Sequence, residues 1–196
     1  MDQLLLNIHP SRQKTLENFV VGKNNECLNS IKKLMQSNNF FFIYIWGAEG
    51  CGKTHLATAL KKHHISVIED VHKFNNEQQV KLFNVFNAAK QNNNKLIVTG
   101  SNSPMNMGLR DDLASRLSWH LVYQLKPLLD DEKKIALAKY AEGIGVSLDD
   151  KVISYCMRNL KRDLPYLIAT VEALSEWSLK SKKPITVPLL KQLLLS

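Results

Sequence analysis

Eight consecutive residues carry the clearest chemical signal in the sequence. Residues 47–54 read Gly-Ala-Glu-Gly-Cys-Gly-Lys-Thr, a full match to the phosphate-binding pattern G-x-x-x-x-G-K-[ST]. Glycines let the backbone wrap an anion with its N–H groups pointing inward, and a following helix adds positive potential at its N-terminus. In this pattern the lysine reaches the β- and γ-phosphates and the threonine hydroxyl is a ligand of Mg²⁺. The motif predicts that the chain binds ADP or ATP through these residues: Glu49, Gly50, Cys51, Gly52, Lys53, Thr54 and His55.

Two acids end the next apolar run along the chain. Glu69 and Asp70 stand where nucleotide hydrolases of this kind place an Mg²⁺ ligand and, often, a water-activating acid. The usual order is Asp then Glu, so the reversed order here misplaces both carboxylates by more than about 1 Å, and such a shift can lower a rate about 10²-fold. We therefore expect Thr54, Glu69 and Asp70 to hold Mg²⁺ if it binds, with slow or absent hydrolysis. The alternative is that the acids simply end a strand.

The elements that must position these groups alternate between strand and helix. Short apolar runs predict strands at residues 40–46, 65–70, 96–99 and 121–125, and helices are expected at residues 27–35 and 54–62. A further helix, capped by Asn76, is expected to bury Val80, Phe83, Val85, Phe86 and Ala89. Such alternation predicts an α/β fold with a parallel, doubly wound sheet of about four strands.

After Pro127 the pattern becomes entirely helical. Helices are expected at about residues 130–142, 149–159, 163–180 and 187–195. The chain is thus divided into an N-terminal segment with a linker helix (1–39), an α/β subdomain (40–127) and a small helical lid (128–196).

Composition limits the class of protein. The chain has 196 residues, 44% of them hydrophobic, and a net charge of +8 that is spread along its length, so a basic nucleic-acid-binding arm is not indicated. No apolar run approaches the ~18 residues of a membrane span. Three scattered cysteines indicate reduced thiols, and we expect a cytoplasmic protein with no membrane partner.

Together these segments resemble the AAA+ family of the replication initiator DnaA, and within it the shortened members of the Hda group of regulatory inactivators. Residues 17–22 (Glu-Asn-Phe-Val-Val-Gly) are similar to the family's adenine-side segment, and residues 42–56 to its P-loop region. Residues 112–119 (Asp-Leu-Ala-Ser-Arg-Leu-Ser-Trp) are similar to its arginine-finger segment, and residues 123–129 to the entry into its lid. Their order and spacing carry the resemblance. Only 14 residues separate Thr54 from Glu69, which implies an AAA+ sheet without one edge strand.

The resemblance implies roles for further residues. Val20 and Val21 would lie against adenine. Arg116 would reach the nucleotide of a neighbouring subunit as a finger in trans, and such an arginine can raise the rate of nucleotide hydrolysis about 10³–10⁵-fold. Ser101 or Asn102 would hold the attacking water. Arg162 would replace the sensor arginine, whose position holds Pro165. The alternatives are a salt bridge from Arg116 to Asp111 or Asp112, a merely polar turn at residues 101–102, and loss of the sensor.

The resemblance also implies partners. Gln3, Leu4, Leu5 and Leu6 are similar to the peptide that docks on the DNA polymerase III sliding clamp, which places a glutamine and leucines in an apolar pocket. No segment resembles the helix-turn-helix that DnaA uses on its origin boxes, so sequence-specific DNA binding is not expected, and self-association of the chain is left open.

The leading hypothesis is a nucleotide-binding regulator that, with the clamp, stimulates hydrolysis of DnaA-bound ATP and prevents re-initiation of DNA replication, its own ATPase activity being weak or absent. The alternatives are a non-catalytic adaptor that recruits or sequesters DnaA, and an autonomous replication-associated ATPase.

Overall fold

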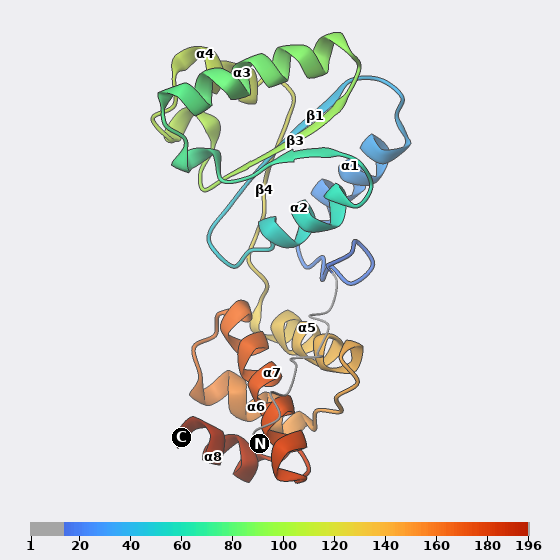
Figure 1. Ribbon diagram of the computed structural model, residues 1–196, viewed down its shortest axis with the longest axis vertical. Coiled ribbons are helices and arrows are strands. Elements are labelled where there is room, and N and C mark those ends of the chain that lie inside the picture. Colours follow the sequence, from blue (N-terminus) through green and yellow to red (C-terminus); the bar gives the residue numbers. More distant parts are fainter. Residues whose placement is uncertain (1–13, 196) are drawn as a thin grey trace, which may run out of the picture. The chain divides into compact units, whose positions relative to one another are not determined.

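The computed structural model describes residues 14–195, which form two compact units, Lys14–Leu128 and residues 129–195 (Figure 1). The boundary lies one residue after the expected one, and the linker helix of the N-terminal segment belongs to the first unit. The clamp-peptide prediction at Gln3–Leu6 falls outside the described residues. Within residues 14–195, no helix combines the length and apolar character needed to cross a bilayer.

A parallel sheet of four strands, in the order β2-β3-β1-β4, forms the centre of the first unit. The strands are β1 (Phe41–Trp46), β2 (Ser66–Ile68), β3 (Lys95–Gly100) and β4 (Leu121–Gln124). β1 pairs with β3 from Phe41↔Lys95 to Trp46↔Gly100, and with β4 from Ile43↔Leu121. β1 is flanked on both sides and covered on both faces, which explains its continuous apolar run. The predicted α/β class and four parallel strands are confirmed.

Helices cover both faces of this sheet (Figure 1). α1 (Asn25–Gln36) and α2 (Lys53–Lys61) pack on one face, where alternate β1 residues Ile43 and Ile45 join their core. α3 (Asn76–Gln91) and α4 (Asp111–Leu117) pack on the other, against Phe42 and Tyr44. The alternation follows from the two-residue period of a strand. Two short 3₁₀ turns, η1 (Val71–Lys73) and η2 (Pro104–Asn106), lie after β2 and β3.

The buried face of α3 differs from the prediction. The helix is capped by Asn75, not Asn76: its side chain accepts a hydrogen bond from the Gln78 N–H at 2.9 Å, and the Gln78 side chain accepts one from the Asn75 N–H. Phe86 and Ala89 are buried as expected, but Val80 and Val85 are 39% and 43% exposed.

The stripe that faces the core in α3 contains a polar residue. It consists of Gln79, Leu82, Phe86 and Ala89, and the Gln79 amide is satisfied by the Phe74 carbonyl at 3.1 Å and the Arg110 N–H at 2.9 Å. The prediction from apolar residues alone was therefore wrong at Val80 and Val85, because a buried glutamine with two backbone partners takes a core position.

β2 is shorter than the predicted run and forms one edge of the sheet. It ends at Ile68, so that both acids lie beyond the strand. An edge strand of three residues offers little backbone for pairing with another chain. The Lys61 ammonium forms an ion pair with Glu69 at 2.7 Å next to this edge and adds charge there.

The second unit is a bundle of four helices around a common apolar core. α5 (Asp130–Gly143), α6 (Asp150–Asn159), α7 (Leu164–Ser181) and α8 (Val187–Leu195) lie within two residues of the predicted bounds. Leu137, Val152, Leu167 and Leu190 are among the residues that fill this core. Pro165 lies in the first turn of α7, where a missing N–H removes no intrahelical bond.

Candidate functional site

The loop between β1 and α2 has the backbone geometry of an anion cradle. Gly50 and Gly52 have φ values of 76° and 107°, in the left-handed region that favours glycine. A Cβ at Gly52 would also lie 2.9 Å from the Phe19 ring. The first turn of α2 carries no acid, so no side chain of that turn opposes the positive end of the helix. Backbone N–H groups at such a helix start suit a phosphate.

Lys53 lies folded over this loop. Its ammonium donates hydrogen bonds to the carbonyl oxygens of Gly47 at 2.7 Å and Ala48 at 2.9 Å, and lies 3.8 Å from the Cys51 sulfur. Cys51 is buried, whereas Glu49 and Thr54 are exposed. The lysine thus lies over the loop, next to the glycines, and its contact with phosphate stays a prediction. The loop, the helix start and Lys53 together fit a phosphate group.

The expected adenine-side segment packs directly on the P-loop helix. Phe19 is buried against Gly52, and its ring meets the His55 ring edge-on with centroids 5.4 Å apart. His55 Nε2 lies 2.9 Å from the Thr15 carbonyl oxygen. His55 therefore contacts the N-terminal segment. Val20 and Val21 follow Phe19 and are half-buried.

A buried amide that the sequence reasoning missed fixes this segment. Asn24 is 4% exposed, and its side chain donates to the Lys126 carbonyl at 3.0 Å and accepts from the Lys126 N–H at 2.7 Å. Its own N–H donates to the Val21 carbonyl at 2.9 Å. One side chain thus ties the adenine-side segment to the chain after β4. An asparagine in the polar stretch Lys-Asn-Asn that follows Val-Val-Gly carries no periodic signal that would reveal this contact.

The two acids expected to hold Mg²⁺ are each paired with a lysine. Glu69 Oε1 lies 2.7 Å from Lys61 Nζ, and Asp70 Oδ2 lies 2.7 Å from Lys73 Nζ. The hydrogen bond from Lys73 holds the pKa of Asp70 below its ordinary value, and the charges of Lys73, His72 and Lys53 act in the same direction.

The donor set can be tested against magnesium. Carboxylate and hydroxyl oxygens are suitable ligands for this ion. Both Glu69 and Asp70, however, already face an ammonium group, and within residues 14–195 no group of three or more His, Cys, Asp or Glu converges as a metal site. The loop fits a phosphate anion, whereas both acids would have to release a lysine before they could hold Mg²⁺.

The predicted sensor residues follow β3. Asn102 is exposed and Ser101 is half-buried. The hydroxyl of the buried Tyr44 donates to the Asn102 carbonyl at 2.8 Å, so this turn is fixed through its backbone. Burial raises the pKa of Tyr44 well above its ordinary value, which keeps this donor protonated.

Arg116 lies in the last turn of α4 among aromatic rings. Its guanidinium carbon is 5.5 Å from the ring centroids of Phe83 and Trp119 and 6.0 Å from that of Phe86. Asp112 instead pairs with Arg110 at 2.8 Å. Among the described residues no carboxylate lies within ion-pair distance of Arg116. Aromatic faces attract a guanidinium without neutralising its charge, so no ion pair within residues 14–195 balances the charge of Arg116.

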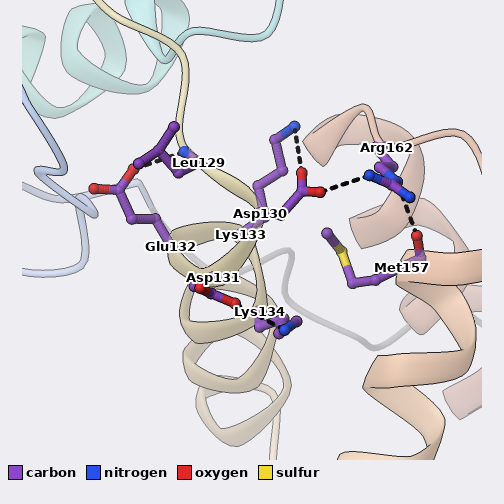
Figure 2. A network of polar contacts seen from close by, with 8 residues as sticks. All are labelled: Leu129, Asp130, Asp131, Glu132, Lys133, Lys134, Met157 and Arg162. Atoms are coloured by element: carbon purple, nitrogen blue, oxygen red, sulfur yellow. Dashed lines mark hydrogen bonds and ion pairs between the residues drawn. The ribbon is translucent and has the colours of Figure 1, made fainter.

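Arg162 lies in the helical unit and belongs to a polar network there (Figure 2). It donates to Asp130 Oδ2 at 2.7 Å and to the Met157 carbonyl at 3.0 Å, while Lys133 Nζ lies 3.7 Å from Asp130 Oδ1. Arg162 therefore joins the start of α5 to α6. Its expected role as a nucleotide sensor stays a prediction.

Two family models match the chain. The bacterial DnaA ATPase domain matches residues 11–67 and 59–124, and the Hda lid domain matches residues 130–194. The two DnaA stretches overlap at residues 59–67, at the shortened connection between α2 and β2.

Several known proteins are similar over most of the chain. An uncharacterised protein of Haemophilus influenzae is 29% identical, with 98% of each chain covered. The crystal structure of domain III of the Thermotoga maritima initiation protein DnaA matches with a TM-score of 0.81 at 20% identity, covering 93% of this chain and 95% of that one. AMPPCP-bound DnaA from Aquifex aeolicus matches with a TM-score of 0.68 at 21% identity, covering 87% and 67%.

These likenesses agree with the geometry. The structural matches show the AAA+ fold, and the T. maritima RuvB motor shares it at a TM-score of 0.67 and 15% identity, covering 93% of this chain and 71% of that one. The DnaA family model covers more than half of the chain. The chain therefore belongs to the bacterial DnaA ATPase-domain family of AAA+ proteins and is an Hda-like member of it.

Proposed function

We propose that the chain is a regulator of replication initiation that binds ADP or ATP and, together with the sliding clamp, stimulates hydrolysis of ATP bound to DnaA. The observation that carries this proposal is Arg116: a charged guanidinium held by aromatic rings, with no acid partner among the described residues, on a DnaA-type body.

Nucleotide binding is supported by the P-loop geometry. A positive cradle for phosphates is formed by the left-handed glycines, the first turn of α2, which contains no acid, and the Lys53 ammonium. The DnaA of Aquifex aeolicus, which shares the fold, carries AMPPCP. Hydrolysis by the chain itself would be slight, because Glu69 and Asp70 are engaged by lysines.

The proposed chemistry belongs to the partner's nucleotide. In phosphoryl transfer the transition state spreads negative charge over the equatorial oxygens of the γ-phosphate, and an arginine inserted from a neighbouring subunit stabilises that charge. Arg116 would act in this way. The rings of Phe83 and Trp119 restrict the guanidinium and so lower the entropy lost when it docks.

The test follows the nucleotide state of DnaA. DnaA loaded with radiolabelled ATP is incubated with DNA-loaded clamp and this chain, and the ADP fraction is measured over time. We expect Arg116→Ala to lower the stimulated rate by on the order of 10³-fold. The matched control is Arg110→Ala, which removes an arginine at the start of α4 that is already paired with Asp112. This variant should stay close to the unsubstituted chain. Full stimulation by Arg116→Ala would refute the finger in trans.

An adaptor without a part in hydrolysis is the second candidate. The lysine-paired acids favour a chain that does no chemistry of its own. If the adaptor is right, Arg116→Ala keeps full activity while deletion of residues 3–6, the proposed clamp peptide, abolishes it. Steady-state ATP turnover by the isolated chain would instead favour an autonomous ATPase.

A further inference from the structure

We infer that Lys73 is a second phosphate-binding cation of the nucleotide site, so that the chain holds a nucleoside diphosphate without carboxylate-bound Mg²⁺. The inference rests on the nucleotide binding proposed above and concerns how the charge of the phosphates is balanced. It starts from the mismatch between the acids of this site and a magnesium ion.

The position of Lys73 is set by the turn that follows β2. Asp70 adopts the left-handed conformation with φ 57°, and its N–H donates to the Thr99 hydroxyl at 3.2 Å on the neighbouring strand. The Lys73 N–H donates to the Asp70 carbonyl at 2.8 Å, and the Lys73 ammonium contacts the Asp70 carboxylate at 2.7 Å. Backbone and side-chain bonds therefore both hold Lys73 at the carboxyl end of β2.

This end of the sheet is also where the P-loop starts. The sheet is parallel, so β1 and β2 end at the same edge with only β3 between them, about 10 Å apart. The electrostatic interactions agree with this proximity. The charge of Lys53 contributes to the lowered pKa of Asp70, and that of Glu49, within the P-loop, contributes to the raised pKa of Lys73. Lys73 and Lys53 thus lie at the same edge of the sheet, and Asp70 feels the charge of both.

A diphosphate can be bound with the help of Mg²⁺ or of lysine side chains, and charge balance distinguishes these two modes. Two unpaired carboxylates would need a divalent cation before phosphates could approach. Here Lys61 and Lys73 already supply two positive charges to Glu69 and Asp70. A Mg²⁺ ion held by both acids would have to take two carboxylates from their lysines, whereas a phosphate requires only that Lys73 turn.

The strength of the existing ion pair permits that turn. The side chains of Lys73 and Asp70 are 68% and 42% exposed, and ion pairs between exposed groups contribute at most about 1 kcal/mol. The ammonium of Lys73 has three N–H donors, so Lys73 can turn toward a phosphate oxygen and still remain close to Asp70. Lys61 stays with Glu69 at the sheet edge.

The test compares binding with and without magnesium. The full chain is titrated with a fluorescent ADP analogue, once in Mg²⁺ and once in excess EDTA. We expect the two dissociation constants to agree within about threefold. Lys73→Ala should weaken binding in EDTA about tenfold or more, and Lys73→Arg should restore it. Lys81→Ala, which removes an exposed lysine paired with Glu77 on α3, is the control and should bind normally.

Each outcome decides between the claims. Absence of binding in both buffers refutes nucleotide binding itself. Binding that requires Mg²⁺ and is indifferent to Lys73→Ala overturns this inference and leaves nucleotide binding intact. Equal binding in both buffers without any effect of Lys73→Ala overturns the role given to Lys73.

Discussion

Replacement of Asn24 by alanine tests whether one buried amide joins the two ends of the first unit. The side chain of Asn24 makes two hydrogen bonds to the backbone of Lys126, at 3.0 and 2.7 Å, across 102 positions of sequence. Asn24→Ala removes both bonds and leaves the N–H and carbonyl of Lys126 without these partners. The segment that carries Phe19 and Val20 would then be joined less firmly to the chain after β4.

The expected loss follows from the two bonds. Each intramolecular hydrogen bond contributes a net 0.5–1.5 kcal/mol or so, which gives about 1–3 kcal/mol for the pair. The bonds are only partly buried, so water can reach the freed backbone groups. We therefore expect about 2 kcal/mol. Asn24→Asp should lose at least as much at neutral pH, because its carboxylate would face the Lys126 carbonyl oxygen.

Urea unfolding followed by tryptophan fluorescence measures this loss. A Trp177→Phe background leaves Trp46 and Trp119, which both lie in the unit Lys14–Leu128, as reporters. Asn84→Ala, on an exposed position of α3, is the matched control and should change stability little. A loss below about 0.5 kcal/mol for Asn24→Ala, or an equal loss for Asn84→Ala, would refute the reasoning.

Two further predictions concern buried groups of the same unit. Gly100→Ala should destabilise the chain by about 1–3 kcal/mol, since the new Cβ would overlap the Tyr44 hydroxyl. Thermal melting should show partial recovery of stability when Tyr44→Phe is added. A double variant no more stable than Gly100→Ala would contradict the clash. Burial raises the pKa of the Cys27 thiol from 9.0 to about 12. The thiol therefore ionises in the unfolded chain at a lower pH than in the folded chain. This difference should lower the free energy of unfolding as the pH rises above 9, by about 1.4 kcal/mol at pH 10. Urea unfolding at pH 8 and pH 10 should show this part of the loss disappear in Cys27→Ala, and identical pH dependence in both chains would show the assignment to be wrong.

Periodicity was sufficient to predict most of the fold. The continuous apolar run of β1 and the alternation of strands and helices predicted the parallel sheet, because burial on both faces selects such runs. The misjudged face of α3 shows the limit of this approach. Val80 and Val85 are apolar yet exposed, while Gln79 is buried through bonds to backbone groups distant in sequence. Tertiary hydrogen bonds of this kind leave no periodic trace.

The candidate site was predictable only where a local motif exists. Residues 47–54 are consecutive in the sequence, so their chemistry can be inferred from spacing alone. The pairing of Asp70 with Lys73 depends on the turn after β2. The absence of an acid partner for Arg116, among the residues described, depends on Asp112 turning to Arg110. In both cases several oppositely charged residues lie nearby in the sequence, and only the three-dimensional arrangement decides which of them form an ion pair.

The strand order has a consequence for synthesis on the ribosome. β1 is complete at Trp46, but both of its neighbours are made later, β3 ending at Gly100 and β4 at Gln124. At about 5–20 residues per second, the roughly 80 residues up to Gln124 take about 4–16 s to add. For those seconds the uncharged stretch Phe-Phe-Ile-Tyr-Ile-Trp has at least one open edge, two until Gly100 has been added, and strong β-propensity, the features that promote intermolecular pairing. A nascent chain of this topology is an expected client for chaperones that shield apolar segments until translation has passed the lid entry.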